Sequence, residues 1–199
     1  MDKKTLRDLI IKQRGLISEA DSRAKSEAIA KQLCETDFYQ KARTVFCFIS
    51  KAGEPNTEPI IRQVFADGKV LCVPRTYPDG LMEAVPVGED AIASKEADWP
   101  SFFGIPEPPK ELGTIDRGEL DMIVVPSLAV DIDGYRLGFG GGYYDRFIES
   151  FRGLRTRPFT VAIQFAEFYY IKKLPRESHD SPVDAIITEE GIIIPSSRP

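Results

Sequence analysis

The stretch 121–147, DMIVVPSLAVDIDGYRLGFGGGYYDRF, contains the three parts that decide the fold. It begins with the apolar run 121–126, which is short, rich in valine and isoleucine, and typical of a strand buried on both faces. A loop with five glycines at 134–142 follows, and the apolar spacing after it predicts a helix from near Tyr143 to Gly153. This order is typical of open α/β folds, in which ligands bind beyond the carboxyl ends of the strands.

The same strand pattern recurs outside this stretch. Four more short apolar runs, each bounded by turn residues, occupy 44–49, 70–74, 159–163 and 184–188. Helical patterns occupy 3–17, the segment from Ser18 to about Cys34, and 57–68, with Ser18 and Thr57 as expected N-caps. Strands that alternate with helices predict βαβ units and a mainly parallel sheet, which is an α/β fold class.

Length and composition narrow the class of protein. The 199 residues fit one domain that spans 1–199, and the net charge of −5 argues against a broad nucleic-acid-binding surface. The cysteines Cys34, Cys47 and Cys72 form no CxxC pair, so we expect neither a zinc site nor a disulfide framework, and Cys47 and Cys72 are expected in the core. The N-terminus lacks an apolar signal region, and every apolar run is too short to span a membrane. We therefore expect a cytoplasmic protein that binds neither nucleic acid nor membrane, with a monomer as the default state.

The glycine-rich loop also carries charged side chains. Glycines that precede a helix let a phosphate group approach backbone N–H groups. Arg136 adds a guanidinium suited to phosphate oxygens, and Asp145 is a candidate carboxylate ligand for Mg²⁺. The alternative is a flexible surface loop that only connects a strand to a helix, but such a loop has no need of fixed and bulky residues.

Two common nucleotide motifs are not matched. A Walker A loop needs Gly-Lys followed by Ser or Thr, but Gly68-Lys69 is followed by Val70. The dinucleotide fingerprint GxGxxG fails because Tyr143 stands where the third glycine belongs. The sequence therefore does not support binding of NAD.

The stretch 121–147 resembles the signature of the 5-formyltetrahydrofolate cyclo-ligase family, GxRLGxGxGYYD preceded by a strand that ends in VPG. Ser127 and Val130 depart from the glycine and phenylalanine usual in that family. Four other segments are similar to family motifs in the same order: KKTLR at 3–7, GEPNT at 53–57, FGIPEP at 103–108 and LPRESHDSPVDAIIT at 174–188.

The resemblance implies a Rossmann-like three-layer α/β/α domain and an ATP-dependent ligase. Such an enzyme converts 5-formyltetrahydrofolate into 5,10-methenyltetrahydrofolate, with release of ADP and phosphate. The implied route transfers a phosphoryl group to the formyl oxygen, after which N10 of the same folate attacks the activated carbon. This chemistry needs positioning and charge stabilisation, not a protein nucleophile.

The resemblance also implies roles for individual residues. ATP, as co-substrate, would be bound by Lys3, Lys4, Arg7, Arg136, Leu137, Gly138, Phe139, Gly140, Gly141, Gly142, Tyr143 and Tyr144. Mg²⁺ would be held by Asp145 and Asp180, and the folate would be bound by Ile49 and Glu54. The implied catalytic residues are Arg136, Tyr143 and Tyr144.

Each of these roles has a simpler alternative. Lys3 and Arg7 would also suit a solvated helix face, Glu54 an ordinary loop, and Asp180 the cap of a turn. The single histidine, His179, is expected to be structural rather than catalytic. The aromatic residues Trp99, Phe102 and Phe103 fit either the core or a wall beside the folate pterin.

Two other functions remain open from the sequence. One is a non-catalytic homologue that binds nucleotide or folate, and the other is a different α/β enzyme with a phosphate loop, such as a sugar-phosphate isomerase. The isomerase class has no need of a basic N-terminal helix that contacts ATP.

Overall fold

The computed structural model describes residues 2–196 except 103, 155, 171 and 178. Its helices are α1 (Lys3–Arg14), α2 (Glu19–Cys34), α3 (Asp37–Lys41), α4 (Glu58–Ala66), α5 (Glu89–Asp98) and α6 (Tyr143–Glu149), with 3₁₀ turns η1 (Arg117–Glu119) and η2 (Ala166–Phe168). Its strands are β1 (Thr44–Cys47), β2 (Val70–Thr76), β3 (Met82–Val87), β4 (Ser101–Phe102), β5 (Ile105–Pro106), β6 (Met122–Val125), β7 (Ala129–Asp131), β8 (Arg136–Leu137), β9 (Phe159–Ile163), β10 (Tyr169–Tyr170), β11 (Ala185–Thr188) and β12 (Gly191–Ile193).

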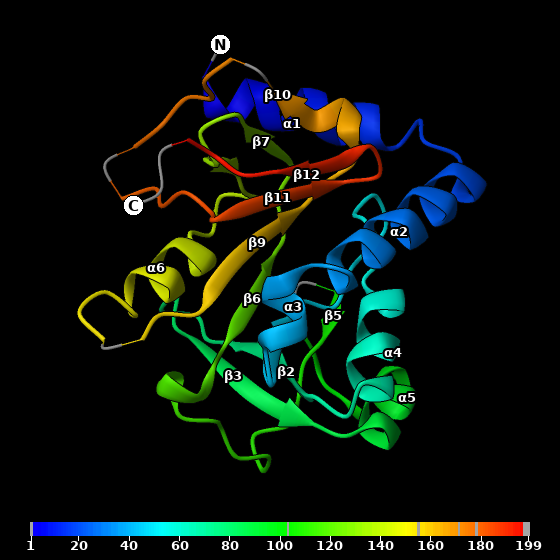
Figure 1. The fold of residues 1–199 in the computed structure, drawn as a ribbon, viewed down its shortest axis with the longest axis vertical. Helices are drawn as coiled ribbons and strands as arrows, with labels where there is room; N and C mark the ends of the chain where they lie inside the picture. Colours follow the sequence, from blue (N-terminus) through cyan, green and yellow to red (C-terminus); the bar gives the residue numbers. More distant parts are fainter. Residues whose placement is uncertain (1, 103, 155, 171, 178, 197–199) are drawn as a thin grey trace.

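The main sheet confirms the predicted α/β class. Its strand order within the described residues is β12-β11-β9-β6-β1-β2-β3 (Figure 1). The five predicted strands are β1, β2, β6, β9 and β11, and each pairs in parallel with its neighbour among them. The edge strands β3 and β12 run antiparallel and were not predicted.

Alternate side chains of the central strands fill two separate hydrophobic clusters. In β1, Val45 and Cys47 join residues of α1, α2, α3 and α4, whereas Phe46 packs with Phe147 of α6. The same alternation runs through the neighbouring strands, so both faces of the sheet are covered. This arrangement gives the three layers expected for the fold, and Figure 1 shows α6 and α2 on opposite sides of β9. Cys47 and Cys72 are buried, as predicted.

The predicted helices are present, with three corrections to their ends. The helix predicted from Tyr143 to Gly153 is too long, because α6 stops at Glu149 and residues 150–153 form a turn. Ser18 caps α2 by accepting a hydrogen bond from the Asp21 N–H, as predicted. Thr57 precedes α4 but makes no side-chain cap, because its hydroxyl oxygen accepts the Ser50 N–H at 3.1 Å instead. The first helix stops at Arg14, so Ile17 lies beyond it.

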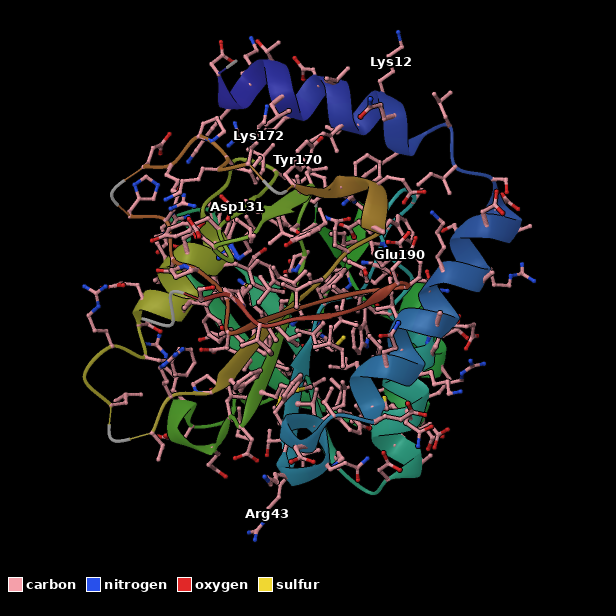
Figure 2. All side chains as sticks on the ribbon, turned by 45° about the horizontal axis from the view of Figure 1, so that its top comes forward. Lys12, Arg43, Asp131, Tyr170, Lys172 and Glu190 are labelled. Carbon is pink, nitrogen blue, oxygen red and sulfur yellow. The ribbon has the colours of Figure 1, made fainter. Side chains whose placement is uncertain are left out.

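The proline-rich segment 99–113 packs against the body of the protein rather than forming a linker. Trp99 is buried in the larger core cluster, and β4 and β5 form a short hairpin. Within the part of the chain that the structure describes, no helix has both the length and the apolar character that a membrane crossing requires. Lys12 and Arg43 point outward at opposite ends of the molecule (Figure 2).

Candidate active site

A cavity of about 500 Å³ lies where the glycine-rich loop, the start of α1 and the loops after β1 and β2 meet. This is the carboxyl end of the parallel strands, where α/β folds bind ligands. The predicted site residues that line it are Lys3, Arg7, Ile49, Glu54, residues 136–144, Asp145 and Asp180. Lys4 is exposed on α1 and is not among the lining residues.

The backbone of the glycine-rich loop takes conformations that favour glycine. Gly140 has φ +106° and Gly142, the N-cap of α6, has φ +66°. A Cβ atom on Gly142 would lie 2.8 Å from the Arg146 guanidinium. The loop therefore favours glycine at Gly142 because of its backbone angle, while the Arg146 side chain would have to shift to admit a Cβ atom.

Hydrogen bonds from neighbouring elements hold this loop. Arg7 Nε donates to Gly138 O at 2.8 Å, which ties the loop to α1. Arg146 donates from Nε to Gly80 O at 3.0 Å and from Nη2 to Gly141 O at 2.6 Å. Hydrogen bonds therefore anchor the loop on two sides. The alternative prediction of a flexible connecting loop does not fit these contacts.

Arg136 projects into the cavity from β8, and its side chain is only 2% exposed. Its Nη2 donates to Asp145 Oδ1 at 2.9 Å, while its Nε has no hydrogen-bond partner within the described residues. Burial lowers the pKa of the Arg136 guanidinium, and the Asp145 carboxylate opposes that shift. A buried cation with unused donors beside a cavity is suited to binding an anion.

The start of α1 brings a second cation to the same wall. Lys3 Nζ donates to Asp180 Oδ2 at 2.7 Å and lies 3.5 Å from a Glu177 carboxylate oxygen. Burial acts to raise the pKa of Asp180, but the hydrogen bonds from Lys3 and from the Glu177 N–H, together with the charge of Lys3, outweigh burial and lower the pKa. The same Oδ2 also accepts the Glu177 N–H at 2.7 Å, so the turn-capping alternative for Asp180 is realised in part.

The two predicted metal ligands both have an oxygen available. Asp145 uses Oδ1 for Arg136 and Asp180 uses Oδ2 for Lys3, and within the described residues their other oxygens accept no hydrogen bond. Ligand atoms of Glu177, His179 and Asp180 also lie within 4.8 Å of one another. Carboxylate oxygens beside an anion site match the ligand preference of Mg²⁺.

The opposite wall is apolar, with one buried carboxyl group. Glu54 is 6% exposed, and its Oε2 accepts the Lys51 N–H at 2.9 Å. Burial raises the pKa of Glu54, and that hydrogen bond opposes the shift. Further lining side chains on this wall are Phe48, Ile49, Pro74, Met82, Phe102 and Ile105.

The tyrosines of the loop differ in their bonding. Tyr143 donates its hydroxyl to Tyr77 O at 2.9 Å, which is a structural contact. Tyr144 makes no hydrogen bond through its hydroxyl within the described residues and lines the cavity. Burial raises the pKa of Tyr144 well above its ordinary value, so its phenol is a proton-bearing donor.

Sequence reasoning missed several cavity residues. Glu107 accepts the Thr76 N–H at 2.9 Å and the Thr76 hydroxyl at 2.6 Å, and burial raises the pKa of Glu107. The segment FGIPEP was noted only as a family likeness, and the acidic residue in it was the available signal. Phe102 lines the cavity and Trp99 joins the core, while the prediction for Phe103 lies outside the described residues.

Comparison with known proteins gives one consistent result. A model of the 5-formyltetrahydrofolate cyclo-ligase family matches residues 1–189. The chain is 29% identical to 5-formyltetrahydrofolate cyclo-ligase of Mus musculus, over 91% of both chains. It is 29% identical to the Escherichia coli K12 enzyme of that name, over 76% of this chain and 80% of the other. The solved structure of Aquifex aeolicus 5,10-methenyltetrahydrofolate synthetase is 28% identical with a TM-score of 0.81, covering 100% of this chain and 95% of that one.

Proposed function

Because the chain belongs to the 5-formyltetrahydrofolate cyclo-ligase family of ATP-dependent ligases, we propose that it converts 5-formyltetrahydrofolate and ATP into 5,10-methenyltetrahydrofolate, ADP and phosphate. The observation that carries this proposal is the composition of one cavity. One wall has the glycine-rich loop, Lys3, Arg7 and Arg136, which suits a triphosphate. The other wall is apolar with Glu54 among its residues, which suits a pterin ring bearing N–H groups.

The proposed reaction has two steps. In the first, the formyl oxygen forms a bond to the γ-phosphorus of ATP, and the bond from that phosphorus to the bridging oxygen breaks, so ADP leaves. In the second, the lone pair of N10 attacks the activated formyl carbon, the carbon–oxygen bond breaks, and phosphate leaves with that electron pair. The N10 proton passes to solvent, and the product carries its positive charge across N5, carbon and N10.

The side chains of this protein act on that sequence by position and charge. Arg136 is placed to stabilise the charge that develops on the transferring phosphoryl group, because its buried guanidinium faces the cavity beside the loop. Lys3 and Arg7 fix the triphosphate from α1. Tyr144 lies between the two walls, where its phenol can donate a hydrogen bond to an oxygen of the reacting group.

Asp145 and Asp180 are the proposed holders of Mg²⁺, each through the oxygen that the protein leaves unused. When bound, this ion supplies positive charge that offsets the negative charge of the ATP phosphates. The exposed His179 is not assigned to the metal or to catalysis. All proposed groups come from one chain, which is consistent with a monomeric enzyme.

One assay tests the proposed function. The protein is incubated with 5-formyltetrahydrofolate, Mg²⁺ and ATP, and the absorbance of the methenyl product is followed. We expect absorbance that appears only when ATP is present. Tight binding of folate or nucleotide without product would support a non-catalytic binding protein instead. If the protein neither binds these ligands nor forms product, the proposed function is wrong.

A further inference from the structure

Lys51 differs from the other lysine and arginine side chains that line the cavity. Lys3 bonds Asp180, Arg136 bonds Asp145, and Arg7 bonds a backbone carbonyl. The Lys51 ammonium instead lies 4.0 Å from the centre of the Phe139 ring. Among the described residues it makes no hydrogen bond or close ion pair, although its charge also acts on the Glu54 carboxylate of the same loop. An exposed ammonium whose closest contact is a ring face is readily drawn away by an anion, since such a contact contributes about 0.5–1 kcal/mol.

Lys51 also lies on the folate side of the cavity. It follows β1 in the same loop as Ile49 and Glu54, and its own N–H holds the Glu54 carboxylate at 2.9 Å. Both Lys51 and Phe139 are exposed, so their contact spans from this loop to the glycine-rich loop at the cavity rim. A ligand whose ring binds near Glu54 would therefore have the exposed Lys51 beside it in the same loop.

The proposed substrate has anionic groups in that outer part. Beyond its pterin and aminobenzoyl rings, a folate ends in glutamate, which carries two carboxylates and gains one with each further γ-linked glutamate. The carboxyl groups of the inner wall, Glu54 and Glu107, do not suit these anions. The positively charged Lys51 at the cavity rim suits these carboxylates.

We propose that Lys51 binds the glutamyl carboxylates of the folate and that the Phe139 ring holds its ammonium when no folate is bound. This inference rests on the proposed function, since it assumes a folate in the cavity. It makes Lys51 a specificity residue for the tail of the substrate, separate from the groups that contact the reacting formyl. Because the pair would be exposed, we expect an effect of roughly fivefold on the KM for folate.

The test compares two substrates in the whole protein. One is 5-formyltetrahydrofolate, and the other is an analogue in which a methylamide replaces the glutamate. In Lys51→Met we expect the KM for the first to rise roughly fivefold and the KM for the methylamide to equal that of the wild type. Lys51→Arg should restore the lower KM, and a triglutamyl substrate should show a larger difference between wild type and Lys51→Met.

A matched control is Lys12→Met, an exposed lysine that points away from the protein on α1 (Figure 2), and it should change neither KM. The inference is overturned if Lys51→Met raises the KM equally for both folates or leaves it unchanged. It is also overturned if the variant raises the KM for ATP instead. If the wild type shows no turnover, the proposed function is wrong, but the inference that Lys51 binds the folate tail is not yet contradicted. Calorimetric binding of the same two folates would then decide whether Lys51 distinguishes them.

Discussion

Two buried arginines of this molecule, Arg14 and Arg136, are used in opposite ways. Counted over the whole residue, Arg14 at the end of α1 is 4% exposed and Arg136 on β8 is 7% exposed. Arg14 spends its terminal N–H groups on acceptors inside the protein: Gly53 O, Ser127 O, Leu128 O and Gln164 Oε1. These acceptors follow three strands of the sheet, so Arg14 ties the loops after β1, β6 and β9 together.

Arg136 makes a single side-chain hydrogen bond among the described residues, to Asp145, and it faces the cavity. Burial lowers the pKa of both guanidinium groups, to about 10 in the case of Arg14. Burial alone therefore does not distinguish a structural arginine from a functional one. The difference lies in how many donors the protein has already satisfied.

The largest effect should come from Arg136→Ala. We expect kcat to fall by about 100- to 1000-fold, because the variant removes charge stabilisation of the transferring phosphoryl group. Circular dichroism and urea unfolding should show a folded protein of nearly unchanged stability. A folded Arg136→Ala protein with normal turnover would show that Arg136 has no such role.

Arg14→Met tests the structural role of Arg14, the other half of the comparison. Several buried acceptors lose their donor at once, so the free energy of unfolding should fall by about 3 kcal/mol. Urea titration measures this, and kcat per folded molecule should fall far less than in Arg136→Ala. Arg14→Lys serves as the control that keeps the charge, and a stable but inactive Arg14→Met would contradict the structural assignment.

Asp145→Asn tests the partner of Arg136. The variant keeps the size of the side chain but removes the charge proposed to hold Mg²⁺. We expect the Mg²⁺ concentration for half-maximal rate to rise by about tenfold or more. Titration of the rate with Mg²⁺ at saturating ATP measures it, and an unchanged requirement counts against the metal role.

Glu54 gives the smallest expected effect, and its pKa makes that effect depend on pH. Burial raises the pKa of Glu54, and the hydrogen bond from the Lys51 N–H, the charge of Lys51 and the charge of Arg14 oppose that shift. Since the ionised carboxylate is proposed to accept folate N–H groups, the KM for folate should rise a few-fold as pH falls through the raised pKa. The onset should lie above the 4.5 of an ordinary glutamate.

Glu54→Gln supplies the control for this pH dependence, because its amide oxygen can still accept the Lys51 N–H. The KM of Glu54→Gln for folate should not vary with pH in that window. The sign for stability is opposite: the native protein holds the Glu54 proton more tightly than the unfolded chain, so this group makes wild type less stable as pH rises through the window. A flat wild-type KM profile would remove Glu54 from substrate binding.

The central fold was predictable because burial on both faces leaves a continuous apolar run. The strands β1, β6 and β11, which form the centres of three such runs, are fully buried along their length. The edge strands β3 and β12 were missed because their residues are partly exposed, and β3 contains Pro86. Their pairing depends on the neighbouring strand more than on their own pattern.

The candidate site was predictable where one segment carries it and not where distant segments meet. The glycine-rich loop supplies residues 136–145 from a single stretch of sequence. Thr76 and Glu107 are 31 residues apart and become a pair only through the packing of their loops. The burial of Arg14 could not be predicted from its sequence neighbours, which are typical of a surface helix. The three loops that bury Arg14 come from distant parts of the chain.

The hydrogen bond between Lys3 and Asp180 joins residues 177 apart in the chain. During synthesis, one wall of the cavity therefore cannot be completed until residue 180 has left the ribosome and the segment before β11 has folded back onto α1. No shorter nascent chain presents the whole site. Bound substrates would then stabilise only molecules whose sheet is fully assembled. Substrates would therefore affect the stability of the finished protein and not its folding during synthesis.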